Sequence, residues 1–101
     1  MMNDIKKEVN ISAFLDEEGK IKQWPAASKN KIAIVGYLAS KFEKNRIYDE
    51  KEVNEIINQW HTFKDYFLLR RSLIDYKLLG RTRNGAEYWV IPKEDEIEGD
   101  N

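Results

Sequence analysis

The side chains best suited to chemistry in this sequence are the basic ones between residues 64 and 83. That stretch holds six Lys and Arg residues and two acidic residues, so its local net charge is +4, whereas the whole chain of 101 residues carries −1. Lys and Arg contact phosphate oxygens, and Arg can also donate two hydrogen bonds to guanine in the major groove of DNA. The stretch therefore predicts a surface that binds double-stranded DNA.

Arg71 is the first candidate for a base or phosphate contact. On a helix, steps of four, three and four residues place it on one outward stripe with Lys64, Leu68 and Asp75. Leu68 could then touch a thymine methyl group. An equally good interpretation makes Arg71 and Asp75 an exposed ion pair that stabilises the helix by a few tenths of a kcal/mol. Arg70 lies nearer the apolar side, where a structural role beside an acidic partner is favoured over a DNA contact.

Two further arginines, Arg81 and Arg83, precede an Asn-Gly dipeptide at residues 84–85. At the tip of a hairpin they could contact phosphates or enter the minor groove. The alternative is a solvated strand in which Arg81 stacks on Tyr88. The two interpretations are evenly matched.

Catalysis and metal binding find little support in the residue types. The chain has no cysteine, and His61 is its only histidine, so a site with two histidines cannot form within one chain. At the end of a helix, His61 is expected to be a cap or a satisfied surface residue. The glycines and serines match neither a phosphate-binding loop nor a nucleophile motif. We therefore expect no enzyme activity and no cofactor or metal.

Hydrophobic periodicity predicts three helices that would position these arginines. The first spans about residues 30–42, with Ser28 or Asn30 as its cap, and the second starts at Asp49 with a capping box to Glu52. The third spans about residues 65–76. The apolar positions expected to face the core are Ile32, Val35, Leu38, Ala39 and Phe42, then Val53, Ile56, Ile57 and Trp60, then Tyr66, Leu69, Leu73, Ile74 and Tyr76.

The Asn-Gly dipeptide predicts a hairpin with strands 79–83 and 87–91 joined by a two-residue type I′ turn. That register places Arg81 opposite Tyr88 and Gly80 opposite Trp89. Between the first two helices, residues 46–48 are expected to add one short strand. The order of helix, strand, helix, helix and hairpin predicts an α+β winged helix-turn-helix, in which the third helix is the recognition helix and the hairpin is the wing.

A turn signal at Asp-Glu-Glu-Gly predicts a short hairpin arm from residues 13–15 and 20–24, closed by Pro25. Phe14, Leu15 and Trp24 of this arm are candidates for an interface with the domain or with a second copy. We expect residues 1–12 to be a flexible N-terminus, 13–92 one winged-helix-like domain with its arm at 13–25, and 93–101 a disordered acidic tail. No membrane segment or signal peptide is apparent, so a cytoplasmic location is expected.

Three segments carry a resemblance to a known family: FLDEEGKIKQWP, KFEKNRIYDEKEVNEIINQWH and LLRRSLIDYKLLGRTRNGAEYW. Through the elements FLD-x-x-G-x-x-x-x-W-P, Y-x-E-x-E-V-N and L-R-R-x-x-x-D, the chain resembles the prokaryotic family "domain of unknown function 2087" over about residues 14–89. The resemblance implies a small bacterial protein classed with candidate transcriptional regulators. Lys77 stands where that family usually has glycine, and a left-handed residue there would cost on the order of 1 kcal/mol.

These patterns together favour a transcriptional regulator that binds DNA as a homodimer, because such regulators use two-fold symmetry to reach two half-sites. The alternative is a non-enzymatic module that binds a protein through the same fold. The near-zero total charge and the position of Asp75 on the expected recognition face favour that alternative.

Overall fold

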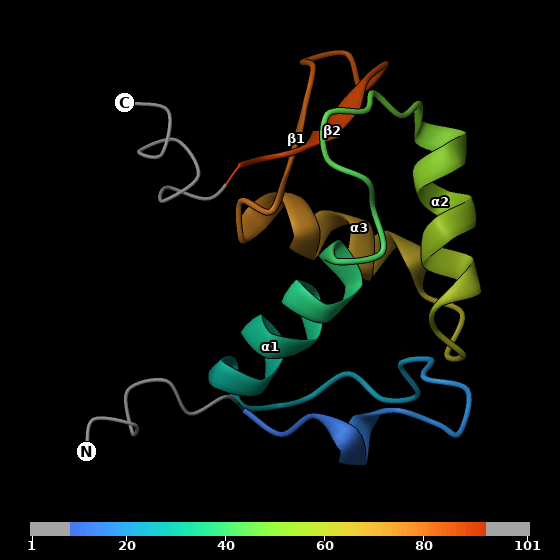
Figure 1. Cartoon of the computed structure of the whole chain (residues 1–101), viewed down its shortest axis with the longest axis vertical. Coiled ribbons are helices and arrows are strands. Elements are labelled where there is room, and N and C mark those ends of the chain that lie inside the picture. The colour runs from blue at the N-terminus through green and yellow to red at the C-terminus, as the bar shows by residue number, and fades with distance from the viewer. Residues whose placement is uncertain (1–8, 93–101) are drawn as a thin grey trace.

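The computed structural model describes residues 9–92, in which three helices pack together below a C-terminal antiparallel hairpin (Figure 1). The elements are the 3-10 turn η2 (Ser12–Phe14), α1 (Ser28–Ala39), α2 (Glu50–Gln59), α3 (Tyr66–Asp75), β1 (Leu79–Arg81) and β2 (Tyr88–Val90). The expected α+β class is confirmed, and the order of elements is consistent with a winged helix. The acidic tail and residues 1–8 of the expected N-terminus lie outside the described residues.

Helix α1 differs from its sequence-based prediction at both ends. Neither Ser28 nor Asn30 caps it, because the N-cap is Ala27, whose carbonyl accepts hydrogen bonds from the backbone amides of residues 30 and 31. The helix ends at Ala39 instead of residue 42, and turns continue the chain to Asn45 at φ 62°. Its buried stripe is Ile34, Val35 and Leu38. Ile32 was expected inside but is 54% exposed, so that assignment was wrong.

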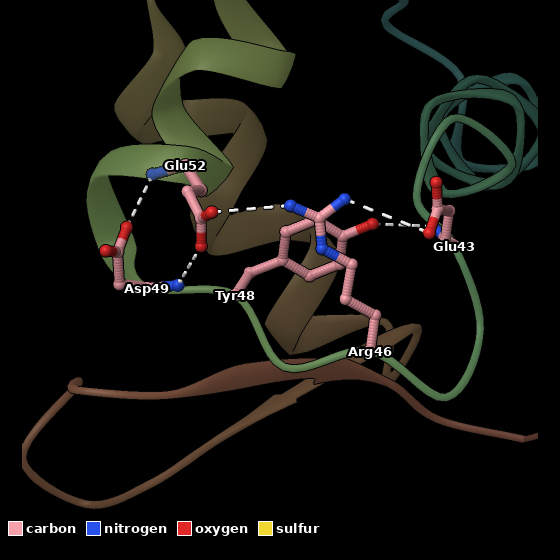
Figure 2. Close-up of polar contacts among 5 residues, drawn as sticks. All are labelled: Glu43, Arg46, Tyr48, Asp49 and Glu52. Atoms are coloured by element: carbon pink, nitrogen blue, oxygen red, sulfur yellow. Dashed lines mark hydrogen bonds and ion pairs between the residues drawn. The ribbon is translucent and has the colours of Figure 1, made fainter.

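The link between α1 and α2 joins the helices to the hairpin. Tyr48 exchanges two backbone hydrogen bonds of 2.8 Å with Tyr88, so the expected extra strand is present as a single bridge. Figure 2 shows Arg46 beside the Tyr48 ring, with ion pairs to Glu43 at 3.8 Å and Glu52 at 3.3 Å. The Tyr48 hydroxyl accepts a 2.7 Å hydrogen bond from the Glu43 amide. These contacts hold the start of α2 against β2.

Helix α2 confirms its predicted start and apolar face. Asp49 accepts from the Glu52 amide at 2.8 Å, and Glu52 accepts in return from the Asp49 amide at 2.9 Å, which completes the capping box (Figure 2). Val53 and Ile57 are fully buried, while the two other apolar residues of this face, at positions 56 and 60, are partly buried against the core.

The turn between α2 and α3 is held by His61. It was expected to be a helix cap or a surface residue, but it is only 6% exposed. Its Nδ1–H donates to the Ile57 carbonyl at 2.8 Å, and its Nε2 accepts from the backbone amide of Asp65 at 2.9 Å. Asp65 is the N-cap of α3 and accepts from the Leu68 amide. His61 therefore fixes where α3 begins relative to α2.

Helix α3 buries Leu69, Ser72 and Leu73. Tyr66 and Tyr76, which were placed on the inner side, are 41% and 38% exposed, so this part of the prediction was wrong. The buried arc is narrow because α3 covers the core with one face only, and residues at its two ends extend past that contact.

The end of α3 is a Schellman motif centred on Lys77. The amide of Leu78 donates to the Leu73 carbonyl at 2.9 Å, and the amide of Lys77 donates to the Ile74 carbonyl at 3.0 Å. Lys77 has φ 63°, in the left-handed region that favours glycine. Lys77 thus adopts the left-handed conformation that glycine adopts without strain, and the protein tolerates the strain of the lysine side chain at this position.

The hairpin has the predicted strand register but a different type of turn. Arg81 pairs with Tyr88 and Gly80 with Trp89, as expected. The strands stop at residues 81 and 88, and residues 82–87 form the loop that we call the wing loop. Gly85 has φ 74°, but Asn84 does not have positive φ, so the type I′ turn was wrong. The 2.9 Å bond from the Gly85 amide to the Thr82 carbonyl closes the turn one residue earlier than predicted.

The arm at residues 13–25 is part of the domain and lies at the opposite end of the molecule from the hairpin (Figure 1). The expected hairpin is reduced to one bridge between Leu15 and Ile21, because residues 12–14 form η2. Ile21 is fully buried and exchanges backbone hydrogen bonds with Trp60 and Thr62 at 2.8 and 3.0 Å. The arm is therefore tied to the turn that precedes α3.

Candidate nucleic-acid interface

A cleft of about 450 Å³ lies between α3, the wing loop and the first turn of α2. We call it the α3–wing cleft. It brings together side chains from three elements: Glu50 of α2, Phe67, Arg70, Arg71 and Asp75 of α3, and Arg81 of the hairpin. Three of the five arginines and lysines proposed from the sequence as DNA contacts thus line one concave surface.

Arg70 has the contacts expected of a structural residue. Its side chain is 15% exposed, and its Nη1 donates to Asn54 at 2.7 Å and to Glu50 at 3.3 Å, both on α2. The guanidinium also lies 5.7 and 5.5 Å from the ring centroids of Tyr66 and Phe67. A charge held in this way orients α3 against α2, and its hydrogen bonds would have to break before it could donate fully to DNA.

Arg71 projects into solvent, with its side chain 69% exposed. Its Nε lies 3.6 Å from Oδ2 of Asp75, four residues along the helix. The ion pair expected as the alternative interpretation is therefore present. A pair this exposed contributes little to stability, so Arg71 can leave Asp75 for another anion at small cost.

The two wing arginines face different sides of the loop. Arg81 lines the α3–wing cleft, and its Nη1 donates to the carbonyls of Thr82 and Arg83 at 3.3 and 3.4 Å. Arg83 lies outside the cleft on a shallow surface that it shares with Ala86 and Glu87. Both residues are exposed, but Arg81 lies over the base of the wing loop and lines the cleft, whereas Arg83 lies on a separate surface.

The outward stripe expected on α3 is shifted. Lys64 lies before the helix, at φ 59°, and Leu68 is half-buried, so neither belongs to the exposed face with Arg71. Phe67 takes that place, because it is 56% exposed and lines the cleft. The spacing of Phe67 and Arg71, four residues apart, could have identified it, but its apolar side chain was not considered as a surface residue.

Thr82 organises the wing loop and was not singled out in the sequence. Its Oγ1 donates to Asn84 Oδ1 at 2.8 Å and accepts from the amides of Ala86 and Glu87, each at 3.1 Å. The hydroxyl therefore joins both sides of the loop. Thr82 follows Arg81 directly, so this network also sets the position of the cleft's third arginine.

The interface candidates of the arm lie on the protein's own core. Phe14, Leu15 and Trp24 are partly buried and pack against the core cluster, and Lys31 of α1 lies 5.8 Å from the Trp24 ring centroid. Docking of the arm on the domain is one of the two possibilities expected from the sequence. Within residues 9–92, no helix has both the length and the apolar character needed to cross a bilayer, and no group of His, Cys, Asp and Glu is arranged to hold a metal ion.

Comparison with known proteins identifies a family. Residues 20–90 match the family model described as "Uncharacterized protein conserved in bacteria (DUF2087)", which covers well over half of the chain. The chain therefore belongs to this family, and the resemblance inferred from its motifs is confirmed. No curated protein and no solved structure matches the chain.

Proposed function

We propose that this member of the DUF2087 family binds double-stranded DNA through α3 and the wing loop, and regulates transcription as a homodimer. The observation that carries the proposal is that Arg71 of α3 and Arg81 of the hairpin line the same cleft. In a winged helix, the recognition helix enters the major groove while the wing contacts the neighbouring backbone. Arginines on both elements, facing one concavity, suit that geometry.

Rigid support of the two elements favours the same function. His61 fixes the start of α3, Arg70 joins α3 to α2, and Thr82 orders the wing loop. Contacts with DNA require a recognition helix that is held in one orientation relative to the wing. The exposed arginines Arg71 and Arg83 are then free of structural tasks, apart from the weak pair with Asp75.

A second candidate is a protein-binding module that uses the same cleft. It is favoured by Phe67, which is 56% exposed, and by the carboxylates of Glu50 and Asp75, which reduce the positive charge of the surface. Exposed aromatic residues beside arginines are common at the centres of protein interfaces. If the cleft binds a protein instead, no salt-dependent binding of the protein to DNA is expected.

Fluorescence anisotropy with a labelled random-sequence duplex distinguishes the two candidates. Wild-type protein should bind at low salt, and its affinity should fall steeply between about 50 and 200 mM salt because phosphate contacts release counterions. The double variant Arg71→Ala/Arg81→Ala removes the two arginines on which the proposal rests. It should reduce the slope of log K against log salt by about two units, one for each lost phosphate contact.

The matched control is Lys22→Ala/Lys29→Ala, which removes the same charge from the arm and the start of α1, far from the hairpin (Figure 1). Its salt slope should equal that of wild type. Wild-type binding weaker than about 10⁻⁴ M at low salt would refute DNA binding and favour the protein-binding module. An equal loss in both double variants would mean that the assigned face is wrong.

A further inference from the structure

Asp75 is an acidic residue in the middle of a basic surface. Its side chain is 63% exposed, it lines the α3–wing cleft beside Arg71, and its Oδ2 lies 3.6 Å from the Arg71 Nε. The other carboxylate of the cleft, Glu50, is bound to Arg70. Asp75 is thus the carboxylate of this cleft that meets a ligand arriving at Arg71.

The fold gains little from Asp75. It is the last residue of α3, where the helix dipole disfavours a negative charge. In its ion pair the base, Arg71, precedes the acid along the helix, and this order is less stabilising than an acid that precedes a base. Both partners are largely exposed, so solvent screens their attraction. A purely structural explanation for an acid at this position is therefore poor.

If α3 contacts DNA, a carboxylate beside Arg71 bears on selectivity. A phosphate that approaches Arg71 must displace Asp75 from the guanidinium and then remain close to a carboxylate. Contacts that depend only on the phosphate backbone are weakened in this way at every sequence. A carboxylate can, however, accept a hydrogen bond from the exposed amino group of cytosine in the major groove, and guanine offers two acceptors to an arginine.

We propose that Asp75 is the specificity-determining residue of the interface: it weakens phosphate contacts at Arg71 and accepts a hydrogen bond from the amino group of a cytosine in the major groove. This inference rests on the proposed DNA binding by α3. It predicts that the preferred DNA site contains a G·C pair under the end of α3. It also predicts that Asp75 lowers the affinity for DNA of any sequence while it raises the preference for the cognate sequence.

The test compares wild type with Asp75→Ala in two measurements at one fixed salt concentration. In titrations with a random-sequence duplex, the variant should bind about two- to fivefold more tightly, the factor that corresponds to an exposed ion pair. In selection from a pool of randomised duplexes, wild type should prefer cytosine at one position by about 5- to 100-fold, and the variant should lose this preference. Its melting temperature should equal or exceed that of wild type.

Glu17→Ala is the matched control, because Glu17 is an exposed acid in the turn of the arm and its removal changes the net charge equally. It should leave both measurements as in wild type. If Glu17→Ala tightens binding as much as Asp75→Ala, or if Asp75→Ala keeps the cytosine preference, Asp75 has no special role and the inference is overturned, while DNA binding stands. If wild type binds no duplex at all, the proposed function fails and the inference with it.

Discussion

Lys77 combines a favourable set of hydrogen bonds with an unfavourable backbone conformation. Its φ of 63° is needed for the Schellman motif that ends α3 and directs the chain into β1. The resemblance to the family implies glycine at this position, so the sequence predicts a cost if Lys77 is left-handed. The helix nevertheless ends with Lys77 in the left-handed conformation. The two hydrogen bonds from the backbone amides of Leu78 and Lys77 to the carbonyls of Leu73 and Ile74 outweigh the strain at Lys77.

Lys77→Gly should therefore stabilise the protein. Relief of the left-handed strain should raise the free energy of unfolding by about 0.5–1 kcal/mol, after the greater entropy of glycine in the unfolded chain is subtracted. Urea denaturation followed by tryptophan fluorescence measures the change. Glu55→Gly, at an exposed position in the middle of α2, is the control and should shift the stability by a similar amount in the opposite direction. Equal destabilisation by both changes would contradict this explanation of Lys77.

Single residues also show where sequence patterns are sufficient. Asp49 and Glu52 form the predicted capping box, since that interaction depends only on two residues three positions apart in the sequence. The outward stripe of α3 was misplaced because Lys64 lies outside the helix and Leu68 is half-buried. The rotation of a helix is set by what packs beneath it, here Leu69 and Leu73, and a repeat of apolar residues on both sides of α3 leaves that rotation ambiguous.

At the scale of elements, the hairpin was predicted in register but not in turn type. The pairing of Gly80 with Trp89 follows from alternation, and a Cβ at Gly80 would lie only 2.7 Å from the indole nitrogen, which explains why glycine is required there. The loop differs from a type I′ turn because the Thr82 hydroxyl binds amides two and three residues beyond Asn84. The turn type was predicted from the Asn-Gly dipeptide alone, and that prediction took no account of the Thr82 side chain, which lies outside the dipeptide.

Thr82→Val tests this explanation of the wing loop. Valine keeps the shape of threonine but loses the hydroxyl, so the Glu87 amide loses its acceptor, while the Ala86 amide keeps only Asn84 Oδ1 at 3.0 Å. We expect faster hydrogen exchange at both amides, with the larger change at Glu87. The loss of stability should be about 0.5–1.5 kcal/mol, since the exposed loop can bind water instead. Thr62→Val, at an exposed position of the α2–α3 turn, is the control and should leave exchange in the wing loop unchanged. Unaltered exchange in Thr82→Val would show that the loop is held without the Thr82 hydroxyl.

At the scale of the whole molecule, the arrangement of charge matters more than its total. The net charge of −1 would suggest no affinity for DNA, yet three arginines and two acids meet in the α3–wing cleft. Sequence reasoning found the basic stretch and the winged-helix order of elements. The pair of Arg71 with Asp75 was predicted, because the two residues are neighbours on one helix. The partners of Arg70 could not be predicted, because Glu50 and Asn54 reach it only after α2 and α3 pack together.

The arm and the hairpin lie at opposite ends of the molecule (Figure 1), which makes the location of a ligand easy to distinguish. Titration of isotopically labelled protein with duplex DNA, followed by backbone amide chemical shifts, tests the central claim most directly. We predict shifts in α3, in the wing loop and in the first turn of α2, with α1 and residues 13–25 unaffected. Shifts confined to the arm and α1, or no shifts at millimolar DNA and low salt, would contradict DNA binding by the α3–wing cleft.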